Sequence, residues 1–369
     1  MKIFERSDRS TFGIWMWNID FKFLGMILLL ILVGILLLMS SVSFKTFYML
    51  NKQLLYLCLA IPTMLFFSFL EVSTIRRIAF FGLLFFLIAA IYTISFGEEI
   101  KGAKRWIRFL NLSIQPSEFI KPFFAIINAW LLSLWIEQKQ FPGRFLSILL
   151  SLIILVILLL QPDIGMSFII ATSWLLQIFL SGLSLYLIII SVFFSLCVFI
   201  ILYNFSFIEI IFPHVQKRIE DFWNGNGFQI EKSLNAFSNG GWFGTGFGEG
   251  SVKTSIPDSQ TDFIFSVAGE ELGIIGASLI IFAYSIIFLR GMLLTSKTGN
   301  IFILLSCSTL IMQFFLQAAV HMASTLDMIP TKGMTLPFIS YGGSSLISSS
   351  IAMGMVLAMT RKNVYWNNS

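Results

Sequence analysis

The chain has 369 residues, of which 57% are hydrophobic and only 12% are charged. A soluble globular chain has about 25% charged residues and roughly 45–50% apolar residues. This composition indicates that lipid, and not water, is the solvent for most of the chain. The net charge of +5 is not gathered into a basic stripe with interleaved aromatics, so the sequence lacks the usual surface of a nucleic-acid-binding protein.

Ten apolar runs follow one another along the chain, each near the length of about 20 residues that a transmembrane helix needs. They begin near Phe23, Gln53, Ile78, Phe119, Phe145, Met166, Leu183, Phe263, Asn300 and Leu336. The first run follows a basic start and has no small-x-small cleavage site after it, so we expect a span that doubles as the targeting signal. Only helices satisfy their own backbone groups in lipid. The sequence therefore predicts an all-α, polytopic membrane protein, with a single domain over residues 1–369.

Basic residues predict the orientation of this bundle. An even number of spans places both termini on one side, which then carries twelve basic residues: Lys2, Arg6, Arg9, Lys22, Arg76, Arg77, Lys139, Arg144, Arg290, Lys297, Arg361 and Lys362. The opposite side carries seven outside its longest loop, and long loops translocate with little regard to charge. The asymmetry predicts cytoplasmic termini and two long extracytoplasmic loops, at 96–117 and 206–261.

The second of these loops contains the glycine-rich run from Gly240 to Gly250. Its glycines permit tight turns, and a flexible surface loop is the simplest interpretation. The three cysteines, Cys58, Cys197 and Cys307, each lie inside an apolar run. We expect them to be small buried hydrophobic residues, and neither a disulfide framework nor a metal site.

Ionisable residues within membrane spans are costly and usually functional. Glu118 and Lys121 lie three residues apart where the fourth span begins. They can form a helix-start ion pair, or Lys121 can face an anionic ligand. Asp262 lies at the mouth of the eighth span, where it is either an ordinary N-cap or an ionised general base. Glu270 and Glu271 follow within the same span, and structural pairing is their expected role.

The segment from Pro330 to Ser345 contains prolines, glycines and hydroxyl residues that break a helix. Broken helices at membrane depth are tolerated where they line a cavity. Hydroxyls and backbone N–H groups at a helix start can hold an anion such as a phosphate. A purely packing role is the alternative.

Six strings in the sequence together resemble the SEDS family of polytopic peptidoglycan polymerases, the group of FtsW, RodA and SpoVE. They are Lys104–Ile107, Gln115–Glu118 with Lys121, Gln161–Gly165, Gly240–Gly244, Thr261–Phe265 with Glu270–Gly273, and Leu336–Ser345. Pro330–Gly333 is similar to the FtsW branch, and Gly248–Ser259 to its α-proteobacterial members. The chain departs from the family at His321–Thr325, where an Asn-Met-x-x-Asn pattern is usual, and in a shortened stretch at 222–228.

The resemblance implies a glycosyltransferase that polymerises lipid II into β-1,4 glycan at the outer face of the bacterial inner membrane, at the division septum. It implies that Asp262 is the catalytic base. The implied substrate-binding residues are Arg105, Glu118, Lys121, Gln161, Asp163, Lys332, Ser344 and Ser345. No cofactor or protein metal site is expected, although a divalent cation assisting the pyrophosphate stays open.

The resemblance also implies partners: a cognate class B penicillin-binding transpeptidase, other division proteins and membrane lipids. The alternatives are a lipid II flippase, a RodA-like elongation polymerase and a non-catalytic scaffold. A flippase needs a polar path to both leaflets, whereas Asp262, Arg105 and Lys332 all belong to one side. That placement favours chemistry at the outer surface.

Overall fold

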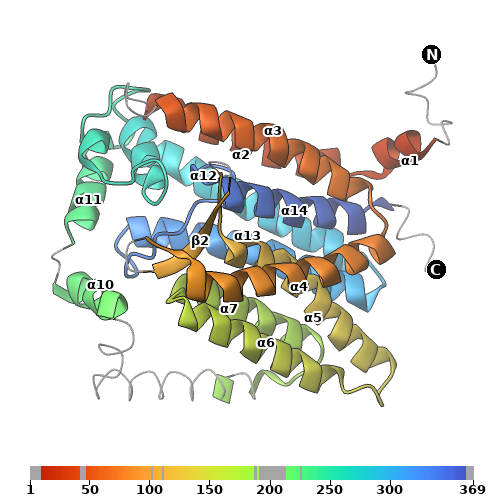
Figure 1. The fold of residues 1–369 in the computed structure, drawn as a ribbon. Helices are drawn as coiled ribbons and strands as arrows, with labels where there is room; N and C mark the ends of the chain where they lie inside the picture. Colours follow the sequence, from red (N-terminus) through yellow and green to blue (C-terminus); the bar gives the residue numbers. More distant parts are fainter. Residues whose placement is uncertain are drawn as a thin grey trace.

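The computed structural model describes residues 10–41, 47–100, 103–109, 112–186, 189–190, 213–224 and 227–362. Its elements form a bundle of long helices that lie side by side (Figure 1). The helices are α1 (Thr11–Asn18), α2 (Phe21–Ser40), α3 (Phe47–Phe69), α4 (Val72–Phe96), α5 (Pro116–Glu137), α6 (Gly143–Leu160), α7 (Ile164–Leu180), α10 (Pro213–Asn224), α11 (Phe228–Gly240), α12 (Ile264–Ser296), α13 (Ile301–Thr325) and α14 (Gly343–Met359).

Seven of these helices are long and apolar enough to cross a membrane, namely α2, α3, α4, α5, α6, α12 and α13. Two shorter apolar helices, α7 and α14, stand at the sixth and tenth predicted spans. The seventh predicted span, from Leu183, lies largely outside the described residues. The prediction of an all-α membrane bundle is confirmed.

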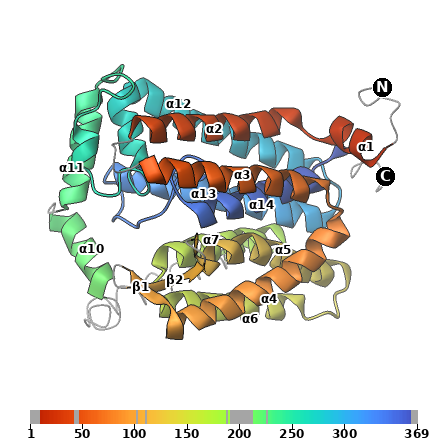
Figure 2. The same cartoon turned by 45° about the horizontal axis from the view of Figure 1, so that its top comes forward.

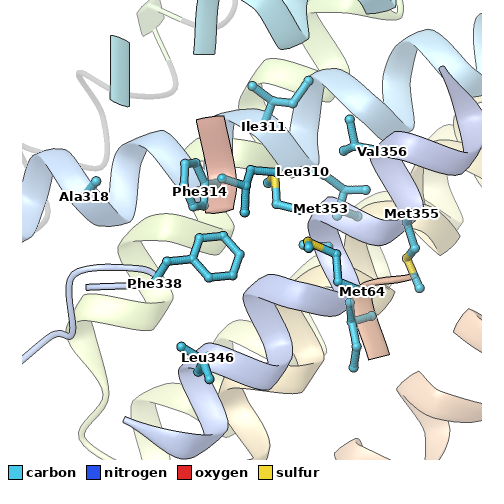
Figure 3. Close-up of a cluster of buried hydrophobic side chains, with 14 of the residues drawn as sticks. Met64, Leu310, Ile311, Phe314, Ala318, Phe338, Leu346, Met353, Met355 and Val356 are labelled. Carbon is cyan, nitrogen blue, oxygen red and sulfur yellow. The ribbon is translucent and has the colours of Figure 1, made fainter. Parts of the chain in front are cut away.

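Burial separates the centre of the bundle from its lipid-facing rim. In both α5 and α13, 72% of the apolar window is buried, against 22% in α4. Figure 3 shows the buried packing around α13 and α14, to which Phe314, Met353 and Met64 belong. Cys307 is buried in this core as expected, but Cys58 is exposed on α3. The prediction of a buried residue is wrong for Cys58, because apolar residues on the rim face lipid as readily as core.

The two predicted extracytoplasmic loops contain regular structure at one end of the bundle. The first forms a three-stranded antiparallel sheet of β1 (Glu98–Ile100), β2 (Ala103–Phe109) and β3 (Leu112–Ile114), in which Ile107 pairs with Ile114. The second contains α10 and α11, which the sequence did not predict. Figure 2 shows α1 at the far end of the bundle from β1, β2 and α11.

The last helix begins at Gly343, so the predicted start near Leu336 is wrong. Pro337 has no N–H to donate to a helix, and Phe338 has a φ of +66°, which a helix excludes. The residues before α14 form a buried turn in which Leu336 N–H donates to Ser340 Oγ at 2.8 Å. Figure 3 shows Phe338 pointing toward Phe314, and their ring centroids lie 5.7 Å apart.

Gly34 of α2 packs directly against this turn. A Cβ added to Gly34 would lie 2.7 Å from both Ile339 Cα and Phe338 O. Because those are backbone atoms, we expect Gly34→Ala to lower the free energy of unfolding by roughly 1–3 kcal/mol, the usual cost of overpacking. Gly25→Ala in the same helix is the control, since a Cβ there meets nothing within 4 Å. Thermal unfolding of the detergent-solubilised variants tests this, and equal midpoints would contradict the packing.

Candidate active site

The turn between α6 and α7 is the first part of the site. Asp163 is the N-cap of α7, and its Oδ1 accepts a hydrogen bond from Met166 N–H at 3.4 Å. Its Oδ2 accepts from Gln115 Nε2 at 3.1 Å and from Ser117 Oγ at 3.3 Å. One carboxylate therefore joins the starts of α5 and α7.

Arg105 of β2 reaches over this turn. Its Nε donates to Gln161 O at 3.0 Å, Nη2 donates to Pro162 O, and Nη1 lies 3.7 Å from Asp163 Oδ1. The Gln161 side chain points the other way and donates to Ala90 O of α4 at 2.9 Å. Gln161 thus contacts Arg105 through its backbone and anchors the turn through its side chain.

Two further cations lie beside Asp163. Lys332 Nζ stands 4.8 Å from the centroid of the Phe168 ring; burial lowers the pKa of Lys332, and Asp163 opposes that shift. Arg218 of α10 donates from Nη1 to Thr331 O at 3.4 Å. Burial and the nearby Arg105 guanidinium lower the pKa of Arg218, while Asp262 and Asp163 raise it. These mutual effects place both arginines and both carboxylates in one electrostatic neighbourhood.

Asp262 is held at this site by the turn before α14. Its own N–H donates to Asp258 O at 3.1 Å. The preceding carbonyl, of Thr261, accepts from Ser340 Oγ at 2.6 Å. Gly333 has a φ of +58°, and a Cβ there would lie 3.2 Å from Asp262 Oδ2. Glycine at this position therefore keeps the loop carrying Lys332 close to the carboxylate.

The site thus gathers three cations, Arg105, Arg218 and Lys332, with two carboxylates, Asp163 and Asp262. The three positive charges, held together at the end of the bundle, favour the binding of an anionic ligand. Asp262 is partly exposed, so it can meet a ligand from outside. The arrangement can neutralise a phosphate group and accept a proton next to it.

Glu118 and Lys121 lie deeper and form the ion pair that was one of the two interpretations. Lys121 Nζ is 2.6 Å from Glu118 Oε2, and each residue is only 5% exposed. Lys121 also donates to Gln317 Oε1 of α13. A small cavity of about 20 Å³ beside them is large enough for a water molecule.

Ser344 and Ser345 begin α14 and already have hydrogen-bond partners. Ser344 Oγ donates to Ser113 O and accepts from Gln115 N–H, each at 3.0 Å. Ser345 Oγ accepts from Thr335 Oγ1 at 2.7 Å. These hydroxyls tie α14 to β3 and to the turn. The binding roles of Ser344, Ser345, Glu118, Lys121, Gln161 and Asp163 stay predictions.

Glu270 and Glu271 have the structural pairing that the sequence predicts. Glu270 Oε1 accepts from Asn239 Nδ2 at 2.9 Å and from Val252 N–H at 2.8 Å, and Oε2 accepts from Lys253 N–H at 2.8 Å. Glu271 forms an ion pair with Lys253 Nζ. Both carboxylates fasten to α12 the residues that flank the glycine-rich run.

Arg218, Gln317 and His321 are site neighbours that sequence reasoning missed. Arg218 was counted only as charge in a long loop, although the apolar and polar spacing of 213–224 signals an amphipathic helix. His321 Nδ1 lies 2.6 Å from Met334 O, so the departure at His321–Thr325 ties α13 to the loop before α14. Gln317 gave no signal, because its partner Lys121 is 196 residues away.

No metal centre is preformed among the residues that the structure describes, where three His, Cys, Asp or Glu side chains nowhere come together. Asp163 is already engaged by Arg105, Gln115 and Ser117. The described residues at this site therefore do not form a built cation site.

Comparison with known proteins identifies the family. The profile of the FtsW/RodA/SpoVE family, described as a cell cycle protein, matches residues 18–365. A curated relative from Caulobacter vibrioides, the probable peptidoglycan glycosyltransferase FtsW, is 34% identical over 97% of this chain and 93% of its own length. Another of that name, from Trichlorobacter lovleyi, is 37% identical over 71% and 69%. The chain belongs to the FtsW/RodA/SpoVE family, as its motifs indicate.

Solved structures share the fold. One chain of a peptidoglycan synthase complex, studied for the coordination of polymerization and crosslinking, has a TM-score of 0.79 at 23% identity, with 94% of this chain and 98% of that chain covered. RodA from Thermus thermophilus has a TM-score of 0.69 at 23% identity, covering 93% and 96%.

The contacts of Glu270 predict the stability of the outer loop. Glu270→Ala would leave Val252 N–H, Lys253 N–H and Asn239 without their acceptor. We expect at least tenfold faster proteolysis of this loop, since each lost bond to a charged group is worth about 1.5–3 kcal/mol. Glu249→Ala, at an exposed position of the same loop, is the control and should be cleaved at the parental rate. Equal cleavage of both variants would refute the role of Glu270.

Proposed function

We propose that the protein is a peptidoglycan glycosyltransferase that joins lipid II units into β-1,4 glycan for septal wall synthesis, and acts as a single transmembrane domain over 1–369. The observation that carries this proposal is the position of Asp262, a partly exposed carboxylate in the electrostatic neighbourhood of Arg218, Arg105 and Asp163. The curated relatives named as probable peptidoglycan glycosyltransferases support it.

In this proposal Asp262 is the general base. It takes the proton from the 4-hydroxyl of an acceptor GlcNAc, and that oxygen forms a bond to the anomeric carbon of a donor MurNAc. The bond from this carbon to undecaprenyl pyrophosphate breaks, and the electron pair leaves with the pyrophosphate. Displacement from the opposite face inverts the anomeric centre and gives a β-linkage.

The cations of the site stabilise the leaving group. Charge develops on the pyrophosphate as the bond breaks, and preorganised positive groups are worth several kcal/mol there. Arg105 is held mainly by the carbonyls of Gln161 and Pro162, so its charge is only partly offset, by Asp163. Lys332 lies on the loop that also carries Gly333, close to Asp262. The undecaprenyl chain is apolar and lies against the lipid-facing helices.

In this proposal the other predicted binding residues hold the helices and strands of the site in position. Asp163, Ser344 and the Gln161 side chain connect β3, α4, α5, α7 and α14 around Arg105. The buried pair of Glu118 and Lys121 fixes α5 against α13 through Gln317. Ser345 shares this network, because Gln317 Nε2 donates to its Oγ at 3.2 Å.

A lipid II flippase is the less favoured function. Passage through the bundle needs a path for a disaccharide with its pyrophosphate, whereas the cavity beside Lys121 has about 20 Å³. Asp262, Arg105 and Lys332 gather at one end of the bundle. The FtsW name of the relatives from Caulobacter vibrioides and Trichlorobacter lovleyi also favours the division branch over a RodA-like elongation polymerase.

Replacement of Asp262 tests the catalytic assignment. Asp262→Asn keeps the size of the side chain but removes the proton acceptor. The interpretation of Asp262 as an ordinary N-cap is wrong, because the N-cap of α12 is Phe263, which forms no side-chain cap. We expect lipid II polymerisation by the purified protein to fall by roughly 10²-fold or more, with lipid II binding retained. Asp258→Asn, in the same turn, is the control and should polymerise at the parental rate. Near-parental polymerisation by Asp262→Asn would refute the assignment.

Orientation is tested by labelling. We propose cytoplasmic termini, which place exposed Ser251 outside and exposed Ser296, at the end of α12, inside. In a background without Cys58, Cys197 and Cys307, Ser251→Cys should react with an impermeant maleimide in intact spheroplasts. Ser296→Cys should react only after permeabilisation. The reverse pattern would overturn the orientation.

We also propose a single-span class B penicillin-binding transpeptidase as the partner at the septum. The glycine-rich loop presents Trp242 and Phe243, 69% and 84% exposed, and aromatic residues are enriched at interfaces. Trp242→Ala together with Phe243→Ala should weaken co-purification of the transpeptidase by tenfold or more. Trp223→Ala on α10, 77% exposed, is the control. Undiminished recovery of the transpeptidase with the double variant would remove this loop from the interface.

A further inference from the structure

A groove of about 540 Å³ lies between α2 and α12, at the far end of the bundle from Asp262. Its wall is apolar and includes Met26, Leu289 and Leu293. Its mouth is charged and includes Arg290, Lys297 and Lys362. The reaction proposed above uses none of these residues, and none belongs to a family motif singled out in the sequence.

Helix α1 shows that the mouth of this groove lies at the membrane surface. Phe12 and Trp17 of α1 are 44% and 41% exposed, and Trp15 stacks on Phe69 at the end of α3 with 4.1 Å between ring centroids. Aromatic side chains in this arrangement are typical of the level of lipid headgroups. Asp20 follows α1 directly and caps α2.

Asp20 also fixes Arg290 at that level. Arg290 Nη2 lies 2.6 Å from Asp20 Oδ2, and Nε donates to Asp20 Oδ1 at 3.0 Å. This two-point contact neutralises Arg290 and locks α2 to α12. The next turns of the chain, at Lys297 and in the segment of Lys362, therefore project to or beyond the headgroup level.

The remaining charge of the groove is positive. Lys297 and Lys362 are exposed, and within the described part of the chain neither forms an ion pair. With Arg290 balanced by Asp20, the described residues leave two positive charges at the mouth, those of Lys297 and Lys362. Below it, Leu289 and Leu293 are 59% and 62% exposed and face lipid.

We propose that this groove binds an anionic phospholipid from the leaflet on the side of the termini. The acyl chains lie along Met26, Leu289 and Leu293, and the phosphate lies between Lys297 and Lys362. An apolar wall that ends in two lysines at headgroup depth fits such a lipid in both polarity and charge. A bound lipid joins α2, α12 and the residues after α14. The inference depends on neither the orientation nor the activity proposed above.

The test compares lipid binding by the full-length purified chain. Native mass spectrometry measures retention of phosphatidylglycerol and of phosphatidylcholine with identical acyl chains. We expect the parent to prefer phosphatidylglycerol. Lys297→Gln with Lys362→Gln should lower phosphatidylglycerol affinity roughly tenfold to thirtyfold, since each lysine near a membrane surface contributes about one factor of five. Phosphatidylcholine retention should not change.

Arg77→Gln with Lys139→Gln is the matched control, because both residues are exposed, basic and at the same end of the bundle but outside the groove. It should bind phosphatidylglycerol like the parent. An equal loss in both double variants would indicate unspecific charge attraction and would overturn the site. No loss of phosphatidylglycerol binding in either double variant would also overturn it. Displacement of the lipid by millimolar inorganic phosphate would instead identify a simple anion site and also overturn the proposal.

Discussion

The buried break before α14 is the constraint on which the rest of the site depends. A chain that leaves helical geometry inside a membrane bundle must satisfy its backbone groups without water. Here Tyr284 OH donates to Pro337 O, and Gln53 Nε2 donates to Ser340 O at 3.3 Å. Ser340 Oγ satisfies the break from within and also donates to Thr261 O. The same bonds that make the break tolerable therefore hold the residue next to Asp262.

A second constraint is the free-energy cost of burying a positive charge, which decides how each cation is paired. Arg105 is satisfied largely by carbonyl oxygens, which accept its hydrogen bonds without cancelling its charge. Lys121, by contrast, is paired with Glu118 at 2.6 Å. Deep in the bundle an unpaired charge is too costly, whereas near its end partial solvation permits one. Between these two cations, the division leaves positive charge on Arg105, where a ligand can reach it.

Sequence alone predicted nine apolar helices that the structure describes, seven of them long enough to cross a membrane, because hydropathy is a local property. It placed the last helix seven residues early, since the apolar character of Leu336, Phe338 and Ile339 looks the same in a helix and in a buried turn. The family resemblance implied Arg105, Asp163, Asp262 and Lys332, which the structure brings together. The sequence did not predict Arg218 as a site residue, because its contact with Thr331 depends on how α10 packs over the site. That contact results from long-range packing, which local sequence patterns do not encode.

The distinction between exposed and buried charge also decides how mutations here are interpreted. Removing one partner of a buried ion pair costs about 3–5 kcal/mol, because the other charge stays behind without compensation. A lost activity on replacement of Lys121 or Glu118 would therefore report folding as readily as substrate binding. Asp262 is partly exposed and its backbone is held by Asp258, so an isosteric change there leaves the packing intact. Chemistry and stability are therefore separable at Asp262 and inseparable at Lys121.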